Sequence, residues 1–219
     1  NRNIKKKDYQ ILIEFNNWKP FHVSNSYLLN FLIKKYNANA IGYEIYRNLF
    51  FKKNFFENIK WFIGSLLYLK TFYIYKSFNV NKFIYPKFDK KIKSIVDKIY
   101  LKKLKKIKNK KDVEKIEINN IWIGDIFYDS FLKKFNLTTI DINSNSFKIY
   151  FKEFLYIFYF WQNYFKKNNV KAVLSSHGVY TFAIPLRIAA YKNIDAFVTN
   201  EQKIYRYKKN NISQKRNLT

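Results

Sequence analysis

The sequence has no cysteine and no methionine, and it contains only four glycines and three prolines. The absence of cysteine excludes disulfides, thiolate catalysis and cysteine-ligated metals, and it suits a reducing compartment. The two histidines, His22 and His177, lie too far apart for a close ligand cluster, so no metal site and no bound cofactor is predicted. Because the chain begins at Asn1 without a methionine, we expect it to be an excerpt or a processed product of a longer protein.

Long apolar runs are also absent. The two longest, Trp61–Leu69 and Phe154–Trp161, fall well short of the ~20 residues that a membrane-spanning helix needs. No basic leader with an apolar segment and a cleavage site is visible, so nothing in the sequence indicates export. We therefore expect a cytoplasmic protein, either free or peripheral at the inner face of the cytoplasmic membrane.

Acidic residues are scarce, 15 against 42 Lys and Arg, which gives a formal net charge of +27. Such a balance attracts nucleic acid, anionic lipid or phosphorylated substrates. However, abundant Lys, Asn, Ile, Phe and Tyr are also what an A/T-rich genome encodes in any protein, and this explanation is favoured over a specific polyanionic partner. With 48% hydrophobic and 21% aromatic residues, the chain is predicted to fold into a globular core.

Familiar nucleotide-binding and nucleophile motifs are missing. There is no G-x-G-x-x-G, no P-loop and no G-x-S-x-G elbow. A nucleotide site, if the protein has one, must lie mostly outside these residues or use plain helix N-termini.

Two segments have the pattern of a strand, a helix and a second strand. They predict an α/β fold with a Rossmann-like open, mostly parallel sheet and helices on both faces. In such sheets ligands bind beyond the carboxyl ends of the strands. The first segment comprises a strand in Tyr9–Trp18, a helix at Tyr27–Tyr36 and a strand at Asn39–Tyr46, and the second comprises a strand at Val170–Leu174, a helix at Thr181–Tyr191 and a strand at Ile194–Val198.

The middle of the chain is aromatic and basic. Leu49–Phe78 is predicted to be helical, Asn81–Phe88 to be a strand stopped by Pro86, and Lys90–Lys111 to be a helix with a solvated basic face. With no Gly/Ser-rich linker, we predict a single domain over residues 1–219 with a basic, aromatic helical insertion around residues 49–112.

The segment after the insertion is predicted to continue the sheet. Val113–Phe135 has the pattern of a strand that ends near Gly124, followed by a helix that Asp125 caps. Ser144–Ser146 is predicted to cap a long aromatic helix at Phe147–Lys167.

Three polar segments are candidate sites. Pro20–Tyr27 contains His22, Ser24 and Asn25 and is predicted to be a strand-to-helix loop, with helix capping preferred over ligand binding. In Ile123–Lys134, Asp125 and Asp129 share one helical face with Tyr128 nearby, and they are able to bind hydroxyls or act as a base.

The third segment is "SSHGVY", which follows a predicted strand. It contains Ser176, His177 and Tyr180, and an imidazole is the natural base for a sugar hydroxyl near neutral pH. A lone histidine is often a structural hydrogen-bonding residue, so both roles stay open for His177.

Two of these segments, "IGDIFYDSFLKK" with the "TTIDI" that follows it, and "VKAVLSSHGVYTFAIPLRIAAYKNIDAFV", together carry a resemblance. In order and spacing they are similar to bacterial capsular and surface-polysaccharide biosynthesis proteins related to two-domain GT-B glycosyltransferases. The resemblance covers about the last hundred residues well and the stretch from Ile11 to Glu44 more loosely. It implies the acceptor-side, N-terminal half of such an enzyme, with a donor-binding domain after Thr219.

The implied reaction transfers a sugar from a nucleotide sugar to a lipid-linked or polysaccharide acceptor. His177 would be the base, and Arg187 would reach a phosphate or form a salt bridge. The acceptor-site candidates are Asp125, Tyr128, Asp129, Ser176 and Tyr180. Basic residues in the middle of the chain would favour an anionic membrane surface.

Two rival functions belong to other classes. One is a nucleic-acid-binding module that uses Lys90–Lys111 and neighbouring aromatics, although no signature of such a fold is present. The other is a non-catalytic scaffold in polysaccharide assembly.

Overall fold

The computed structural model describes residues 8–45, 55–87, 89–199 and 203–212, without the side chains of residues 55–58. In this part of the chain six strands form one sheet in the order β3-β2-β1-β6-β7-β8. Every pairing is parallel except that of β7 with β8. The strands are β1 (Tyr9–Glu14), β2 (Asn39–Tyr43), β3 (Val80–Ile84), β6 (Asn169–Ser175), β7 (Asp195–Thr199) and β8 (Ile204–Arg206).

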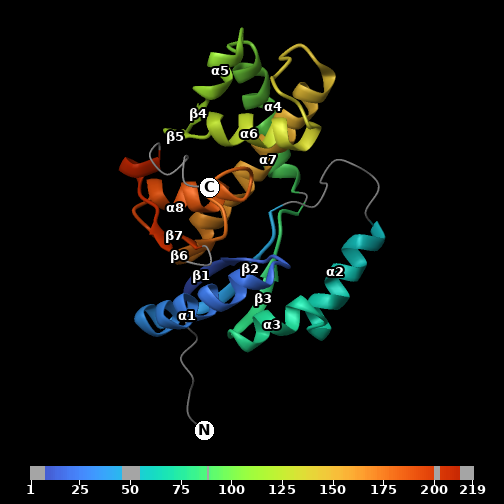
Figure 1. The fold of residues 1–219 in the computed structure, drawn as a ribbon. Coiled ribbons are helices and arrows are strands. Elements are labelled where there is room, and N and C mark those ends of the chain that lie inside the picture. Colours follow the sequence, from blue (N-terminus) through green and yellow to red (C-terminus); the bar gives the residue numbers. More distant parts are fainter. Residues whose placement is uncertain (1–7, 46–54, 88, 200–202, 213–219) are drawn as a thin grey trace.

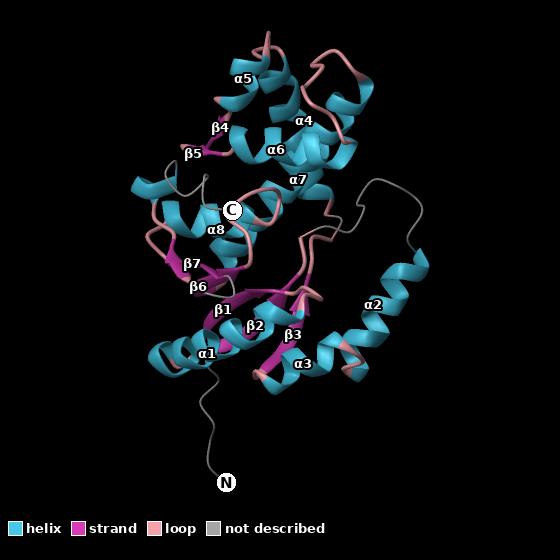
Figure 2. Ribbon diagram, in the orientation of Figure 1, coloured by secondary structure: helices cyan, strands magenta, loops and turns pink. Residues whose placement is uncertain are grey.

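Helices cover both faces of this sheet (Figures 1 and 2). One face carries α1 (Lys19–Tyr36), α3 (Thr71–Ser77) and the neighbouring α2 (Phe55–Leu67), and the other carries α7 (Asn145–Lys167) and α8 (Ala183–Tyr191). Three further helices pack outside α7, namely α4 (Lys90–Leu104), α5 (Lys110–Glu114) and α6 (Gly124–Phe135). The prediction of an α/β fold with a mostly parallel sheet between helices is therefore confirmed.

The central strands are apolar because they are buried on both sides. Along β1, Leu12 belongs to the core beneath α7 and α8, whereas Ile11 and Ile13 belong to the core beneath α1 and α3. Along β6, Val173 belongs to the first of these cores and Leu174 to the second. Neighbouring residues thus contribute to opposite cores.

Helix α1 begins much earlier than the sequence suggested. Pro20 lies in its first turn, where the fixed φ of proline suits a helix and its missing N–H is not needed. The predicted loop Pro20–Tyr27 is therefore helical, and Ser24 and Asn25 do not cap it. Instead, the hydroxyl of Ser24 donates to the carbonyl of Phe21 at 3.4 Å, within the helix.

The predicted strand before Gly124 does not join the main sheet. It forms a separate antiparallel hairpin of β4 (Glu117–Ile118) and β5 (Ile121–Trp122). Between these strands, Asn119 and Asn120 both have positive φ, 52° and 59°, as a tight two-residue turn requires. The sequence pattern was strand-like, but the Asn-Asn turn folds it back on itself.

Helix α6 starts at Gly124 as expected, but for a different reason. A Cβ at this position would lie 2.3 Å from the carbonyl oxygen of Val113 and 2.4 Å from that of Glu114, so only glycine fits. No side chain caps this helix, and the expected capping role of Asp125 is wrong. Ser144 does cap α7, because its hydroxyl accepts a hydrogen bond from the Phe147 amide at 3.2 Å.

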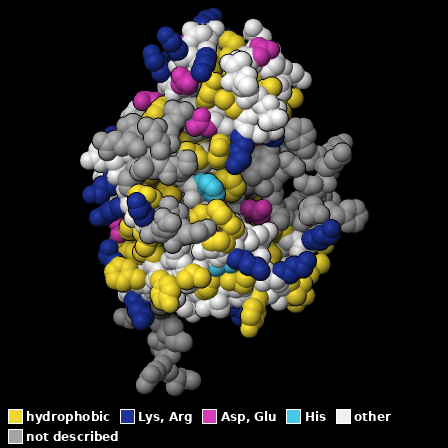
Figure 3. Space-filling model, viewed as in Figure 1, with side chains coloured by type: hydrophobic (Ala, Val, Ile, Leu, Met, Phe, Trp, Pro, Cys, Tyr) yellow, Lys and Arg dark blue, Asp and Glu magenta, His cyan; other side chains and the backbone are white. Residues whose placement is uncertain are grey.

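The basic middle segment is divided more finely than predicted. α4 ends at Leu104 and α5 is separate, while α2 and α3 are divided near Lys70, which has a φ of 51°. Residues 49–54 of the predicted helix lie outside the described residues. α4 buries Ile92 and Val96 and presents its lysines to solvent, and Figure 3 shows Lys and Arg scattered widely over one side of the molecule.

Asp195 connects three elements at the start of β7. Its carboxylate accepts hydrogen bonds from Tyr36, from Lys35 at 3.2 Å and from Arg206 at 2.5 Å. Burial acts to raise the pKa of Asp195, but the hydrogen bonds from Tyr36, Lys35 and Arg206 outweigh it and lower the pKa below its usual value.

Asp195→Asn should lower the free energy of unfolding at pH 7 by about 1 kcal/mol, a small loss because Lys35 and Arg206 are largely exposed. A carboxylate with a lowered folded-state pKa stabilises the fold above its unfolded pKa of about 3.9, and this contribution is lost as the pH falls through the folded-state pKa. Urea unfolding of both proteins from pH 7 to pH 3 should show the difference shrinking below about pH 4. A difference that does not change with pH would contradict this assignment.

Candidate functional site

The carboxyl ends of β1 and β6 meet at the point where the chain changes direction across the sheet. From β1 the chain continues to β2 on one side, whereas β6 continues to β7 on the other. Open α/β sheets bind ligands at such a switch point. The residues at this place are Glu14, which ends β1, and Ser175, Ser176 and His177, which end or follow β6.

Glu14 is a buried carboxylate with three donors. It accepts hydrogen bonds from the Ser175 hydroxyl at 2.6 Å, the Ser176 amide at 2.7 Å and the Ser176 hydroxyl at 2.7 Å. Only 1% of Glu14 is exposed, so these bonds replace the water that the charge has lost. They also join β1 to the loop that follows β6.

The hydrogen bonds of Ser176 determine how His177 is protonated. Its hydroxyl lies 2.7 Å from Glu14 Oε1 and 2.6 Å from His177 Nδ1, and it has one proton to donate. Because the carboxylate only accepts, that proton goes to Glu14, and the ring must donate from Nδ1. In the neutral imidazole Nε2 is then unprotonated and is able to accept a proton.

Two buried tyrosines complete the surroundings of Glu14. Burial raises the pKa of Tyr43 well above its usual value, and the negative charge of Glu14 raises it further. Burial also raises the pKa of Tyr75, whose hydroxyl donates to the backbone carbonyl of Glu14 at 2.7 Å. Both phenols therefore stay protonated, which leaves Glu14 as the charged group at the end of β1.

The His177 ring lies between aromatic side chains from two helical segments. Its centroid is 6.1 Å from that of Phe21 on α1 and 5.8 Å from that of Phe182 at the start of α8. Trp18, which is exposed, packs edge-on against Phe21 at 4.6 Å. His177 itself is only partly buried, so its ring is held by aromatic contacts and still reaches solvent.

A third strand brings polar groups to the same edge. At the end of β7, the hydroxyl of Thr199 donates to the Asn25 side-chain oxygen at 2.6 Å, and both residues are buried. The adjacent strands β1, β6 and β7 thus all end in buried polar side chains. This polar edge is where the fold class predicts a ligand site.

Asp125 and Arg187, two predicted substrate contacts, are paired with each other. Arg187 donates to the two carboxylate oxygens of Asp125 at 3.1 and 2.7 Å, to the Trp122 carbonyl at 2.7 Å and to the Tyr207 hydroxyl at 3.1 Å. Both charged side chains are almost completely buried. The pair joins α6 to α8, and its hydrogen-bonding groups are occupied within the protein.

The other predicted contacts lie on or beside α6. Tyr128 is buried, with the Lys110 ammonium 4.7 Å from its ring centroid, and Asp129 is partly buried on the same helix. Tyr180, three residues after His177, has a φ of 57° and carries the Lys133 ammonium 4.0 Å from its ring centroid. The end of α6 therefore lies against the loop that carries His177.

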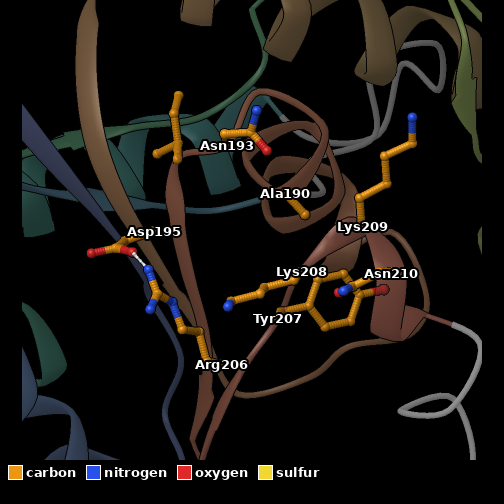
Figure 4. Close-up of a pocket in the computed structure, with 9 residues that line it drawn as sticks. Ala190, Asn193, Asp195, Arg206, Tyr207, Lys208, Lys209 and Asn210 are labelled. Atoms are coloured by element: carbon orange, nitrogen blue, oxygen red, sulfur yellow. Dashed lines mark hydrogen bonds and ion pairs between the residues drawn. The ribbon is translucent and has the colours of Figure 1, made fainter.

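A pocket of about 580 Å³ lies at the amino end of β7, beside Asp195, which begins that strand (Figure 4). Its lining includes Asn193, Arg206 and Lys208, and Arg206 forms the ion pair with Asp195 drawn there. Because ligands of open α/β sheets bind at the carboxyl ends of strands, the site around His177 is the stronger candidate.

Comparisons with protein-family models, with curated proteins and with solved structures find no match for this chain. The candidate site therefore depends on the geometry of these residues.

The sequence singled out His177 and Ser176 as candidates but gave no prediction for Glu14. Its signal was a single acidic residue at the end of the otherwise apolar strand "ILIE". The role of this acid becomes visible only in the fold, where β6 lies beside β1 and brings the donors Ser175 and Ser176 to Glu14.

The tautomer of His177 can be tested by correlating its ring nitrogens and protons in NMR spectra, at a pH where the ring is neutral. We expect the Nδ1–H form in the unmodified protein and a shift toward Nε2–H in Ser176→Ala, which removes the acceptor of the Nδ1 proton. His22 is the only other histidine, and His177→Gln identifies its signals. An Nε2–H form in the unmodified protein would refute the proposed direction of the hydrogen bonds.

Arg187→Met should lower the free energy of unfolding by about 3–5 kcal/mol, because it leaves Asp125 buried without its partner. Arg206→Met is a matched control, since Arg206 is 56% exposed and Asp195 keeps its bonds to Tyr36 and Lys35, so the loss should be at most about 1 kcal/mol. Chemical denaturation measures both. Equal losses in the two variants would mean that the buried pair is not a structural connection.

Proposed function

We propose that the chain is the acceptor-side half of a glycosyltransferase that builds a cell-surface polysaccharide, with His177 as the general base. The observation that carries the proposal is the hydrogen-bonded series Glu14–Ser176–His177 at the switch point of the sheet. It supports a base because it leaves Nε2 unprotonated and points the protonated nitrogen toward a buried carboxylate.

The chemistry requires one proton transfer and one displacement. His177 Nε2 removes the proton of an acceptor hydroxyl as its oxygen attacks the anomeric carbon of a nucleotide sugar. The new glycosidic bond forms while the bond from that carbon to the nucleotide phosphate breaks, and the nucleotide leaves with the electron pair. The imidazolium that forms is stabilised because its Nδ1–H points through Ser176 to Glu14, as in other base–carboxylate pairs.

The surroundings of His177 suit a sugar acceptor. Buried Phe21 holds the imidazole on one side, and Phe182, which is partly exposed, offers an apolar surface on the other. The partly exposed position of His177 leaves a path for a hydroxyl. The acceptor would be lipid-linked or a growing polysaccharide, and the nucleotide sugar would be held mainly by a second domain. Arg187 has no part in this, because Asp125, Trp122 and Tyr207 already occupy its donors.

The nucleic-acid alternative would use the lysines of α4. That helix packs Ile92 and Val96 on the core and exposes its lysines, as any solvated basic helix does. The series at His177 lies on β1 and in the loop after β6, whereas the lysines of this alternative lie on α4. A substitution at His177 alone should therefore distinguish the two functions.

His177→Gln in the full-length protein should lower sugar transfer by about 10²–10⁴-fold, the range expected for losing a general base. The measurement is nucleotide release from a panel of nucleotide sugars in the presence of acceptor extracts. Thermal unfolding should be nearly unchanged, because the ring is only partly buried.

His22→Gln is the control for histidine replacement. His22 lies inside α1 with its Nε2 3.1 Å from the Asn16 carbonyl, so its loss should affect stability more than turnover. Unchanged transfer in His177→Gln would return His177 to a structural role and refute the proposed mechanism.

A further inference from the structure

The layer formed by α1, α2 and α3 exposes an unusual number of large apolar side chains. Single exposed apolar side chains are ordinary on soluble proteins, but a group of them on the helices of one layer marks a candidate interaction surface. We call this set the apolar helical face. It consists of Trp18, Val23, Tyr27, Phe31, Ile59, Phe62, Ile63, Leu66, Leu67, Leu69 and Tyr73.

Helix α2 is apolar on two sides. Its inner side places Trp61 against Phe72, with Gly64 allowing the Phe72 ring to approach. Its outer side carries apolar residues at positions 59, 62, 63, 66 and 67, the spacing of one helical stripe, and Leu66 and Leu67 are 63% and 61% exposed. A stripe with this spacing normally faces a core, so its exposure here indicates an apolar partner.

Helix α1 has an exposed apolar row of its own in the same layer. Val23, Tyr27 and Phe31 follow one another at four-residue intervals and are 63%, 77% and 61% exposed. Trp18 precedes the row, and Tyr and Trp are the side chains that favour the boundary between lipid and water.

Lysines predominate around this face, although Glu44 lines a pocket with Trp61 and Ile63, and Asp195 pairs with Lys35. No acidic residue occurs between Phe15 and Tyr43 or between Ile59 and Lys87, whereas exposed lysines occur throughout both stretches. In Figure 3 hydrophobic and basic side chains are interspersed over the lower part of the molecule, where α1 and α3 lie in Figure 1. The exposed lysines are Lys19, Lys34, Lys35, Lys60, Lys70, Lys76 and Lys82, of which Lys35 is paired with Asp195.

We propose that the apolar helical face docks on the surface of an anionic lipid bilayer. The exposed lysines would bind the headgroups, while the outer stripes of α1 and α2 enter the boundary of the acyl chains. A second copy of the chain is the weaker occupant, because self-association would bring lysines against lysines. Among the described residues no helix is long and apolar enough to cross a bilayer, so the contact would be interfacial.

The face lies next to the candidate site. Phe21 belongs to α1 and lies beside His177, so docking through α1 would hold the site close to the lipid surface. The inference itself does not depend on the proposed reaction, because the exposure and charge of these helices are independent of what His177 does.

The test is flotation of the purified chain with vesicles of phosphatidylcholine, with and without 30% phosphatidylglycerol. We expect binding to the anionic vesicles that weakens at high salt. The variant Leu66→Gln/Leu67→Gln should lower the partition coefficient by about 10- to 100-fold, because two leucine side chains no longer enter the lipid. Quenching of tryptophan fluorescence by brominated lipid that is lost in Trp18→Phe should report contact of the start of α1, because the protein has three other tryptophans.

The matched control is Leu101→Gln, since Leu101 is 59% exposed on α4, away from this face. It should bind vesicles like the unmodified protein. The proposal is overturned if the chain does not float with anionic vesicles, or if Leu101→Gln weakens flotation as much as the α2 variant. It is also overturned if light scattering shows a dimer that the α2 variant dissociates while vesicle binding is unchanged. Transfer activity lost in His177→Gln with normal flotation would separate this inference from the proposed function.

Discussion

The buried charge of Glu14 is the constraint on which the candidate site depends. A carboxylate with 1% exposure is costly unless donors surround it, and here all three donors come from Ser175 and Ser176. The loop after β6 must therefore adopt one conformation to satisfy the acid at the end of β1. That conformation places the Ser176 hydroxyl where it orients His177.

The second buried charge has a different role. Asp125 and Arg187 neutralise each other in a bidentate pair and join the outer helical layer to α8. The Glu14 carboxylate is instead held by neutral donors, namely the hydroxyl groups of Ser175 and Ser176 and the Ser176 amide. A neutralised pair suits a structural connection. A carboxylate held by neutral groups keeps its negative charge, which can stabilise a neighbouring imidazolium.

The parts of the fold that follow from local pattern were predictable. β1, β6 and β7 appear as short apolar runs because both of their faces are buried, and Ser144 was recognisable as the cap of α7. Features that depend on remote residues were not predictable. Pro20 was placed in a strand-to-helix loop but lies in the first turn of α1. The Asn119–Asn120 turn folds the predicted strand into a separate hairpin, and Arg187 pairs with Asp125, which is 62 residues away in the sequence. The role of Glu14 was hidden in the same way, because its partner Ser176 is 162 residues away.

That separation has a consequence for how the protein is made. At a synthesis rate of about 5–20 residues per second, β1 would wait roughly 8–30 s before Ser176 leaves the ribosome. During this time β1 can pair with β2, but its other edge has no strand beside it. Glu14 would be the charged group at the end of that open edge, where it disfavours pairing with a strand of another chain. The carboxylate that orients the site would thus also reduce aggregation of the nascent chain before β6 pairs with β1.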